Sequence, residues 1–382
     1  MLKGVNLTLM IGPAVPVPVS PSVLDALTSV TVSTSSGETA SGFELVFTLS
    51  NKSPLHTVFL LSGGAMPPII RVIIIVTLNG TPHVLMDGVI LNQEVTPGEG
   101  GSHSVLTIKG KDLTALMDII DFSGIPYPAM PNFAQVAFIL AKYGALGIVP
   151  LAIPEIVTDI PIPISHIPQH QGKDLAHIQK LAYESGYVFY LDPGPAPGMS
   201  VAYWGPEIKV GAPQPALNIN MDAYTNVDSL RFSIDKERKK IPIVYIQEEM
   251  SKAVIPLPIP DITPLNPPLG LIPPIPPKLV PLGDELQDTV YVFRSPLHAV
   301  MAGLAEAARS SDAVFGSGTL NVARYGRILK ARQLVGVRGA GPAFDGLYYV
   351  KSVTHSIKRG EYKQNFEVAR NGLLSTVPRV PV

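Results

Sequence analysis

The chain has 382 residues, of which 46% are hydrophobic and 15% are charged, and its formal net charge is −1. This length exceeds what one ordinary core needs, so two or more domains are expected. The chain has no cysteine, which excludes disulfides, thiolate metal sites and cysteine nucleophiles, and its charge provides no basic field for nucleic acid.

The apolar composition has two interpretations. One is that proline- and isoleucine-rich segments and large buried faces account for it. The other, which we favour, is that partner subunits cover much of the surface, because monomers rarely expose large apolar patches.

Residues 1–25 contain several prolines and are predicted to form an extended arm. From residue 27 to about residue 109 the pattern predicts successive short strands, with a hairpin turn at Asn79-Gly80. The apolar run at 67–78 is shorter than the roughly 20 residues of a membrane helix, so we expect no membrane insertion by this chain itself. Regular short strands with turn signals predict a barrel or a sandwich.

After these strands the apolar period changes. Asp112 precedes a predicted helix, and Asn132 is predicted to cap a second one. Asp174 is predicted to stand at the start of a third helix, which ends at Gly186 before another strand. Strands are predicted again within residues 216–250.

The segment 256–281 alternates proline with isoleucine and leucine, so it cannot form a helix. Two interpretations stay open: a disordered surface loop, or an extended segment packed against its own domain or a neighbour. A charged run at 236–240 is predicted to be a solvated hairpin turn, and Ser295 is predicted to cap a helix.

The C-terminal part predicts a hairpin with one buried face. Residues 347–357 and 362–370 are rich in β-branched and aromatic side chains and flank a turn at 358–361. The predicted buried face of the second strand holds Tyr362, Gln364, Phe366 and Val368.

No residue pattern predicts catalysis, a cofactor or a metal. His166 and His170 are four apart, but Pro168 lies between them and disfavours a helical metal pair. Ser62-Gly63-Gly64 lacks the nucleophile-elbow pattern, and the glycine-rich run at 336–341 precedes a strand, which is typical of a turn and not of a phosphate loop. Four carboxylates have no diagnostic spacing and are expected at the surface: Asp118, Asp121, Glu155 and Asp159.

Three segments, in this order along the chain, resemble one family. Residues 172–191 read Gly-Lys-Asp-Leu-Ala-His-Ile-Gln-Lys-Leu-Ala-Tyr-Glu-Ser-Gly-Tyr-Val-Phe-Tyr-Leu, and residues 226–232 read Asn-Val-Asp-Ser-Leu-Arg-Phe. The closing hairpin contains Gly-Leu-Tyr-Tyr-Val-Lys-Ser-Val-Thr-His-Ser-Ile at 346–357. Together they resemble phage late control protein D and the hub part of VgrG spike proteins, which are baseplate hubs of contractile tails and injection systems.

The resemblance implies a mainly β fold with α+β insertions, containing two tube-like β-barrel domains plus small α+β subdomains. The implied divisions are an arm at 1–25, a first β-barrel domain at 26–111, α+β middle subdomains at 112–215, returning strands at 216–250, a proline-rich insert at 251–284 and a second β-barrel domain at 285–382.

The resemblance also implies the function. Such a chain is not an enzyme: it forms a homotrimer that adapts a six-fold inner tube to a three-fold spike, inside a phage-tail-like particle assembled in the cytoplasm. Because this chain stops at Val382, the spike is expected to be a separate protein, and other baseplate components are further partners. The expected interface residues are Tyr203, Trp204, Ile272, Ile275, Tyr348 and Tyr349.

Two alternatives belong to other classes. A tail-associated cell-wall hydrolase or carbohydrate-binding protein would need a carboxylate pair or a zinc triad in a cleft. A membrane-associated β protein would explain the apolar composition.

Overall fold

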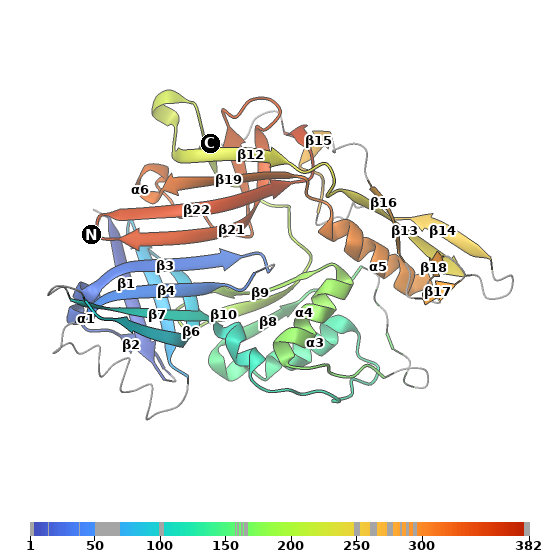
Figure 1. Ribbon diagram of the computed structural model, residues 1–382, viewed down its shortest axis with the longest axis horizontal. Helices are drawn as coiled ribbons and strands as arrows, with labels where there is room; N and C mark the ends of the chain where they lie inside the picture. Colours follow the sequence, from blue (N-terminus) through green and yellow to red (C-terminus); the bar gives the residue numbers. More distant parts are fainter. Residues whose placement is uncertain are drawn as a thin grey trace.

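The structure is a computed structural model that describes residues 4–13, 15–37, 39–49, 69–98, 103–156, 158, 160–161, 163, 167–247, 253–259, 266–272, 278–282, 285–287, 290–292 and 296–377. Figure 1 shows three parts: a large β-sheet, an α+β unit beside one end of it, and a smaller unit of strands around a helix that extends to one side. The mainly β fold with α+β insertions is therefore confirmed.

The N-terminal half of the large sheet contains six strands and the short β2 (Val17–Pro18), which precedes helix α1 (Pro21–Ala26). The six strands are β1 (Val5–Gly12), β3 (Leu27–Ser35), β4 (Gly42–Leu49), β5 (Arg71–Leu78), β6 (Thr81–Thr96) and β7 (Ser104–Asp112). The described part of residues 1–25 does not form the expected extended arm. Its first strand, β1, instead pairs along its whole length with β5. Its prolines all follow Gly12, so residues 5–12 keep the alternation that a strand needs, and Leu9 is buried.

The C-terminal half of the sheet also contains six strands, with the short helix α6 (Val322–Tyr325) after one of them. They are β11 (Gln214–Asn218), β12 (Val227–Ile234), β19 (Val314–Asn321), β20 (Leu334–Arg338), β21 (Gly346–Lys358) and β22 (Glu361–Arg370). β21 and β22 are the predicted closing hairpin, and the predicted face of β22 is buried as expected: Tyr362, Gln364, Phe366 and Val368.

The two halves have the same strand connectivity. The spatial order is β1-β5-β6-β7-β4-β3 in one half and β11-β20-β21-β22-β19-β12 in the other. If the six strands of each half are numbered in sequence order, the spatial order reads 1-4-5-6-3-2 in both halves. One difference is that β1 and β5 are antiparallel whereas β11 and β20 are parallel. The structure therefore contains an internal repeat that the sequence does not display.

β3 joins the halves by pairing antiparallel with β21, from Ser35 opposite Ser352 to Ser29 opposite Lys358. We call this pairing the seam. It merges the halves into one thirteen-stranded sheet over one hydrophobic core. Among the described strands the pairing path runs from β12 to β2, so the two expected tube-like domains are joined as two halves of one continuous sheet.

The α+β unit has its own core against a three-stranded sheet in the order β8-β10-β9. Its elements are η2 (Leu113–Asp118), α3 (Asn132–Ala141), η3 (Gly144–Leu146), β8 (Ile148–Ala152), α4 (Asp174–Ser185), β9 (Val188–Pro193) and β10 (Ser200–Gly205); η4 (Asp222–Tyr224) follows β11. α4 starts at Asp174 and ends at Gly186 as predicted, the glycine having a φ of 66°. The predicted helix after Asp112 is a short 3-10 helix, and Asn132 is the first helical residue instead of the cap.

The side unit packs α5 (Pro296–Arg309) on a small sheet, with Ala299 against Val244 and Ile259. Its strands are β13 (Lys240–Gln247), β14 (Val254–Pro258), β16 (Lys278–Leu282), β17 (Glu285–Gln287) and β18 (Val290–Val292), while β15 (Gly270–Ile272) pairs with β23 (Leu373–Ser375). The described parts of the proline-rich insert thus form short strands. The turn at 236–240 does not close a hairpin, because β12 pairs with β19 whereas β13 pairs with β14 and β16.

Candidate functional site

Several strand edges of the large sheet have no described partner, and two of them belong to β12 and β6. β12 pairs only with β19, so its other edge is open. β6 pairs with β5 up to Val89, whereas its pairing with β7 continues to Thr96. Within the described residues, positions 91–96 of β6 therefore have one open edge, and Leu91 and Val95 there are 57% and 41% exposed. Open edges of this kind are templates for pairing with another chain.

The outward face of the sheet is lined by small polar side chains that stand opposite one another. One row crosses five strands and passes over the seam: Ser229, Thr319, Asn365, Thr354 and Ser33. Thr319 Oγ1 donates to Asn365 Oδ1 at 2.8 Å, and the Ser33 and Thr354 hydroxyls are 3.0 Å apart. We call this the hydroxyl face. Because none of these five side chains is charged, the row itself is neutral.

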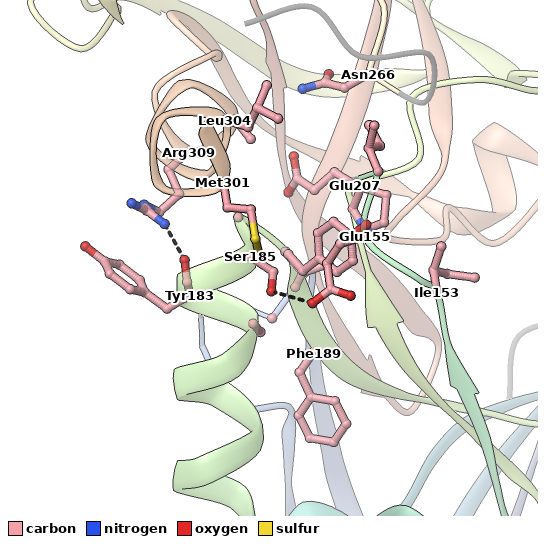
Figure 2. A pocket seen from close by; sticks show the side chains of 18 of the residues that line it. Ile153, Glu155, Tyr183, Ser185, Phe189, Glu207, Asn266, Met301, Leu304 and Arg309 are labelled. Atoms are coloured by element: carbon pink, nitrogen blue, oxygen red, sulfur yellow. Dashed lines mark hydrogen bonds between the residues drawn. The ribbon is translucent and has the colours of Figure 1, made fainter. Parts of the chain in front are cut away.

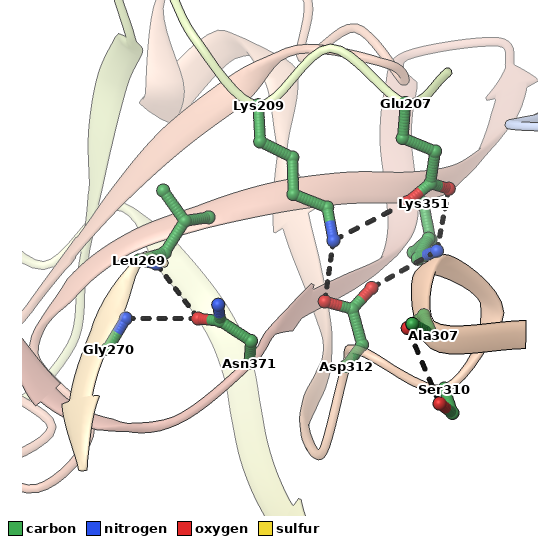
Figure 3. A network of polar contacts seen from close by, with 9 residues as sticks. All are labelled: Glu207, Lys209, Leu269, Gly270, Ala307, Ser310, Asp312, Lys351 and Asn371. Atoms are coloured by element: carbon green, nitrogen blue, oxygen red, sulfur yellow. Dashed lines mark hydrogen bonds and ion pairs between the residues drawn. The ribbon is translucent and has the colours of Figure 1, made fainter. Parts of the chain in front are cut away.

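A buried network of four charges lies where the three parts of the chain meet (Figure 3). Lys209 Nζ is 2.7 Å from Asp312 Oδ1, and Lys351 Nζ is 2.7 Å from Glu207 Oε1 and 3.2 Å from Asp312 Oδ2. Glu207 and Lys209 follow β10, Asp312 links α5 to β19, and Lys351 belongs to β21. We call these four residues the junction network.

The charge balance of the junction network determines the protonation of its central acid. Burial alone would raise the pKa of Asp312, but Lys209 and Lys351 outweigh burial and hold that pKa well below its ordinary value. Two acids and two lysines alternate in the network, so each buried charge has an opposite neighbour. The network therefore fixes the α+β unit, the side unit and the large sheet relative to one another.

Arg332 makes a second connection between the α+β unit and the sheet. Its guanidinium lies 3.8 Å from the ring centre of Tyr190 and donates to Ser35 O at 2.8 Å and Leu191 O at 3.0 Å. Arg71 makes a third: it is paired with the buried Asp87 at 2.7 Å and donates to Gly198 O at 3.1 Å.

Next to the junction network is a cavity of about 630 Å³, bounded by the C-terminal end of α4, by α5 and by the segment after β8 (Figure 2). We call it the junction cavity. Apolar walls come from Ile153, Phe189, Met301 and Leu304, among others.

Two polar side chains of the junction cavity are almost fully buried and incompletely paired. Glu155 is 9% exposed, and its Oε1 accepts from Ser185 Oγ at 3.2 Å, while its Oε2 has no hydrogen-bond partner. Asn266 is 8% exposed, and its Oδ1 has no partner either. Burial raises the pKa of Glu155 above its ordinary value. Hydrogen bonds from its own backbone, from the side chains of Ser185 and Asn132 and from the backbone of Phe133 only partly offset this.

Of the expected interface residues, four are buried within the chain and one is exposed. Trp204 and Tyr348 are fully buried, and Tyr203 and Tyr349 are 5% and 1% exposed, so all four pack within this chain and not on a surface for partners. The cause is their position on β10 and β21, whose aromatic residues pack inward, for example Tyr203 stacked on Tyr190. Ile272 is 47% exposed and stays available, whereas Ile275 lies outside the described residues.

The candidate chemical residues are scattered. The Asp118 side chain is 54% exposed, as expected, and Asp121 is exposed as well. Glu155, which was expected at the surface, is buried because the chain after β8 turns inward beneath α5. The patterns at Ser62-Gly63-Gly64, Asp159 and His166 lie outside the described residues.

His170 belongs to a buried polar cluster in the α+β unit. Its Nδ1 lies 2.7 Å from Tyr127 Oη, and its ring centre is 4.3 Å from that of His177. The neighbouring Asp174 carboxylate accepts from Lys142 at 2.8 Å and from Tyr143 at 2.6 Å. Over the described part of the chain, no group of three or more histidines and carboxylates is arranged to hold a metal ion.

No helix within the described ranges is both long and apolar enough to cross a membrane. The sequence did not point to Asn266 or the junction network, and it placed Glu155 at the surface, because nothing in their local patterns distinguishes them from surface polar residues. A tertiary contact brings each of them into the interior.

No family model matches this sequence, and no curated protein matches it. Solved structures do match. A tail protein from Neisseria meningitidis MC58 has a TM-score of 0.62 at 14% identity, covering 97% of this chain and 98% of that one. The 43 kDa tail protein of prophage MuSo2 from Shewanella oneidensis has a TM-score of 0.63 at 14% identity, covering 96% and 98%.

VgrG-containing structures match as well. A chain of the Francisella PdpA–VgrG complex has a TM-score of 0.59 at 10% identity, covering 100% of this chain and 60% of that one. These similarities show that the chain has the fold found in phage tail and baseplate proteins, in agreement with the family that the three sequence segments resemble.

Proposed function

We propose, starting from this shared fold, that the chain is a structural baseplate hub subunit that forms a homotrimer and connects a six-fold inner tube to a three-fold spike. The observation that carries the proposal is the internal repeat, in which two halves have the same strand order. Three chains with two similar halves each would present six similar units. A ring of this kind has three-fold symmetry overall and an approximate six-fold arrangement of its units.

The seam supports this proposal because it is itself a contact between two halves. Within the chain, the edge strand β3 pairs with the part of β21 that β20 leaves open, residues 352–358. β3 and β12 hold the same position in the strand orders of the first and second halves. β6 and β21 likewise hold the same position in the first and second halves. The equivalent contact would pair β12 of one chain with residues 91–96 of β6 in a neighbouring chain.

Both strands of this equivalent contact are open, as the contact requires. Repeating it in one direction is a head-to-tail association, which closes into a ring when the rotation fits. The hydroxyl face would then continue from chain to chain as one neutral wall, and the open edges would be covered by pairing. The tube and a separate spike protein would bind the two rims of this ring inside a tail-like particle.

The test is the molar mass of the purified chain by light scattering, with two matched substitutions of exposed valines. Val95→Arg places a charge at the open edge of β6, while Val149→Arg places one on β8, at 41% and 47% exposure in the wild type. We expect a trimer for the wild type and Val149→Arg, and a folded monomer for Val95→Arg. A wild-type monomer that persists in the presence of the spike protein would contradict the proposal.

A further inference from the structure

The junction cavity contains unpaired hydrogen-bond acceptors, Glu155 Oε2 and Asn266 Oδ1, which the proposed trimer contact does not involve. We propose that it binds a lysine or arginine side chain, flanked by apolar residues, on a partner polypeptide, with the cationic group at Glu155. This site is separate from the open strand edges, and its occupant need not be another copy of the chain.

The unpaired oxygens indicate what the occupant must supply. Glu155 Oε2 and Asn266 Oδ1 are acceptors without donors, each on a side chain that is more than nine-tenths buried. A buried acceptor without a partner is costly, and a buried carboxylate is more costly still. A ligand with several N–H groups, such as an ammonium or a guanidinium, has the donors that unpaired oxygens of this kind require.

The cations around the junction cavity already have partners within the chain, so they do not neutralise Glu155. Arg309 donates to Tyr183 O and, at 2.8 Å, to Glu306 Oε2. Lys351 is paired in the junction network, and Arg238 stacks on the ring of Phe315 at 4.8 Å. The lining acid Glu207 is paired with Lys351, whereas among the described residues Glu155 forms no ion pair, which favours a cationic occupant.

The walls and the size of the cavity favour an organic side chain over a bare ion. Ile153, Met301 and Leu304 line the cavity with apolar surface, which suits the methylene stem of a long basic side chain. At about 630 Å³ the cavity has room for neighbouring apolar side chains of the same segment. The α+β unit, the side unit and Lys351 of β21 all contribute to its lining, so an occupant would contact all three parts of the chain.

The experiment uses three capped tripeptides as probes: acetyl-Leu-Arg-Leu-amide, its lysine analogue, and its norleucine analogue without charge. Binding to the full chain is measured by isothermal titration and by ligand-observed NMR. We expect the arginine and lysine peptides to bind at least about tenfold more tightly than the norleucine peptide, since hydrogen bonds to charged groups are the stronger ones.

Two variants and a control assign the binding to this cavity. Glu155→Gln should remove the preference for cationic peptides, and Leu304→Trp, which fills the cavity, should abolish binding of all three peptides while the chain stays folded. Asp25→Asn removes an exposed acid on α1, away from both the junction cavity and the open strand edges, and should change nothing. Equal binding of the norleucine peptide, unchanged binding by Glu155→Gln, or no binding by the arginine peptide at its solubility limit would overturn the proposal. The trimer measured by light scattering should persist in all these variants, so failure here is distinguishable from failure of the hub assignment.

Discussion

β3 and β12 hold the same position in the two halves of the sheet, yet their surroundings differ. β3 lies in the middle of the thirteen-stranded sheet because β21 covers its outer edge, and Val32 at its centre is fully buried. β12 has the same neighbours within its own half but no described strand on its outer edge, and Ile234 at its end is 38% exposed. The comparison shows that the seam covers the outer edge of β3, whereas the corresponding edge of β12 has no described partner strand.

The largest expected effect comes from breaking the seam. Val32→Asp buries an unpaired carboxylate between β3 and β21 and should cost about 5 kcal/mol or more in the free energy of unfolding. The matched change on β12, Ile234→Asp, should cost less than about 1 kcal/mol, because that side chain reaches water. Urea unfolding of both variants measures the difference, and similar losses in both would contradict the assigned roles of the two strands.

The second prediction concerns the junction network, where Lys351 is adjacent to the seam and Lys351 O accepts from Ser36 N at 2.8 Å. Asp312→Asn leaves two buried lysines short of a partner and should lower the free energy of unfolding by about 3 to 5 kcal/mol. Because the folded pKa of Asp312 is depressed, its contribution is present above the ordinary value of 3.8 and is lost as pH falls below it. Denaturant titrations at several pH values should show this acid loss in the wild type and not in Asp312→Asn.

The third prediction uses a titratable group within the seam. His355 of β21 stands opposite Val32, and its Nδ1 lies 2.8 Å from Tyr362 Oη. Burial lowers the pKa of His355 from 6.5 to about 3, so between these values the unfolded chain binds the proton and the folded chain does not. Stability should therefore fall as pH drops below 6.5, by up to about 1.4 kcal/mol per pH unit.

The control for His355 is an exposed histidine. His355→Gln should reduce the slope of the stability profile between pH 6 and 4 without removing it, because burial also lowers the pKa of His177, to about 4. His103→Gln, at an exposed position, should leave the profile unchanged. A wild-type profile that is flat over this range would show that His355 is not buried as a neutral ring.

The smallest effect is expected on the outward face. Lys109 and Glu44 form a pair at 3.4 Å with side chains that are 54% and 40% exposed. Lys109→Gln should change the free energy of unfolding by less than about 1 kcal/mol, because exposed ion pairs contribute little. Thermal unfolding at low and high salt measures it, and a salt-dependent loss above this limit would show that the outward face is more than a neutral wall.

Local patterns in the sequence were sufficient to predict the elements that depend on interactions between residues close together in the chain. The closing hairpin follows from alternation around one turn, and α4 follows from an apolar stripe between Asp174 and Gly186. The turn at Asn79-Gly80 is also as predicted, with both residues at positive φ. The buried face of β22 was predictable for the same reason, since residues two apart point to the same side of a strand.

Tertiary structure alone decided the rest. Residues 5–12 pair as a strand with β5, far along the chain, and Glu155 is buried where the segment after β8 meets the end of α4. Ser33 and Thr354, which meet at the seam, are 321 positions apart in the chain, and no periodicity within a short window records such a pairing. The repeat of the two halves was hidden for the same physical reason: it resides in the order of strand pairing, which depends on long-range contacts and not on the local pattern of side chains.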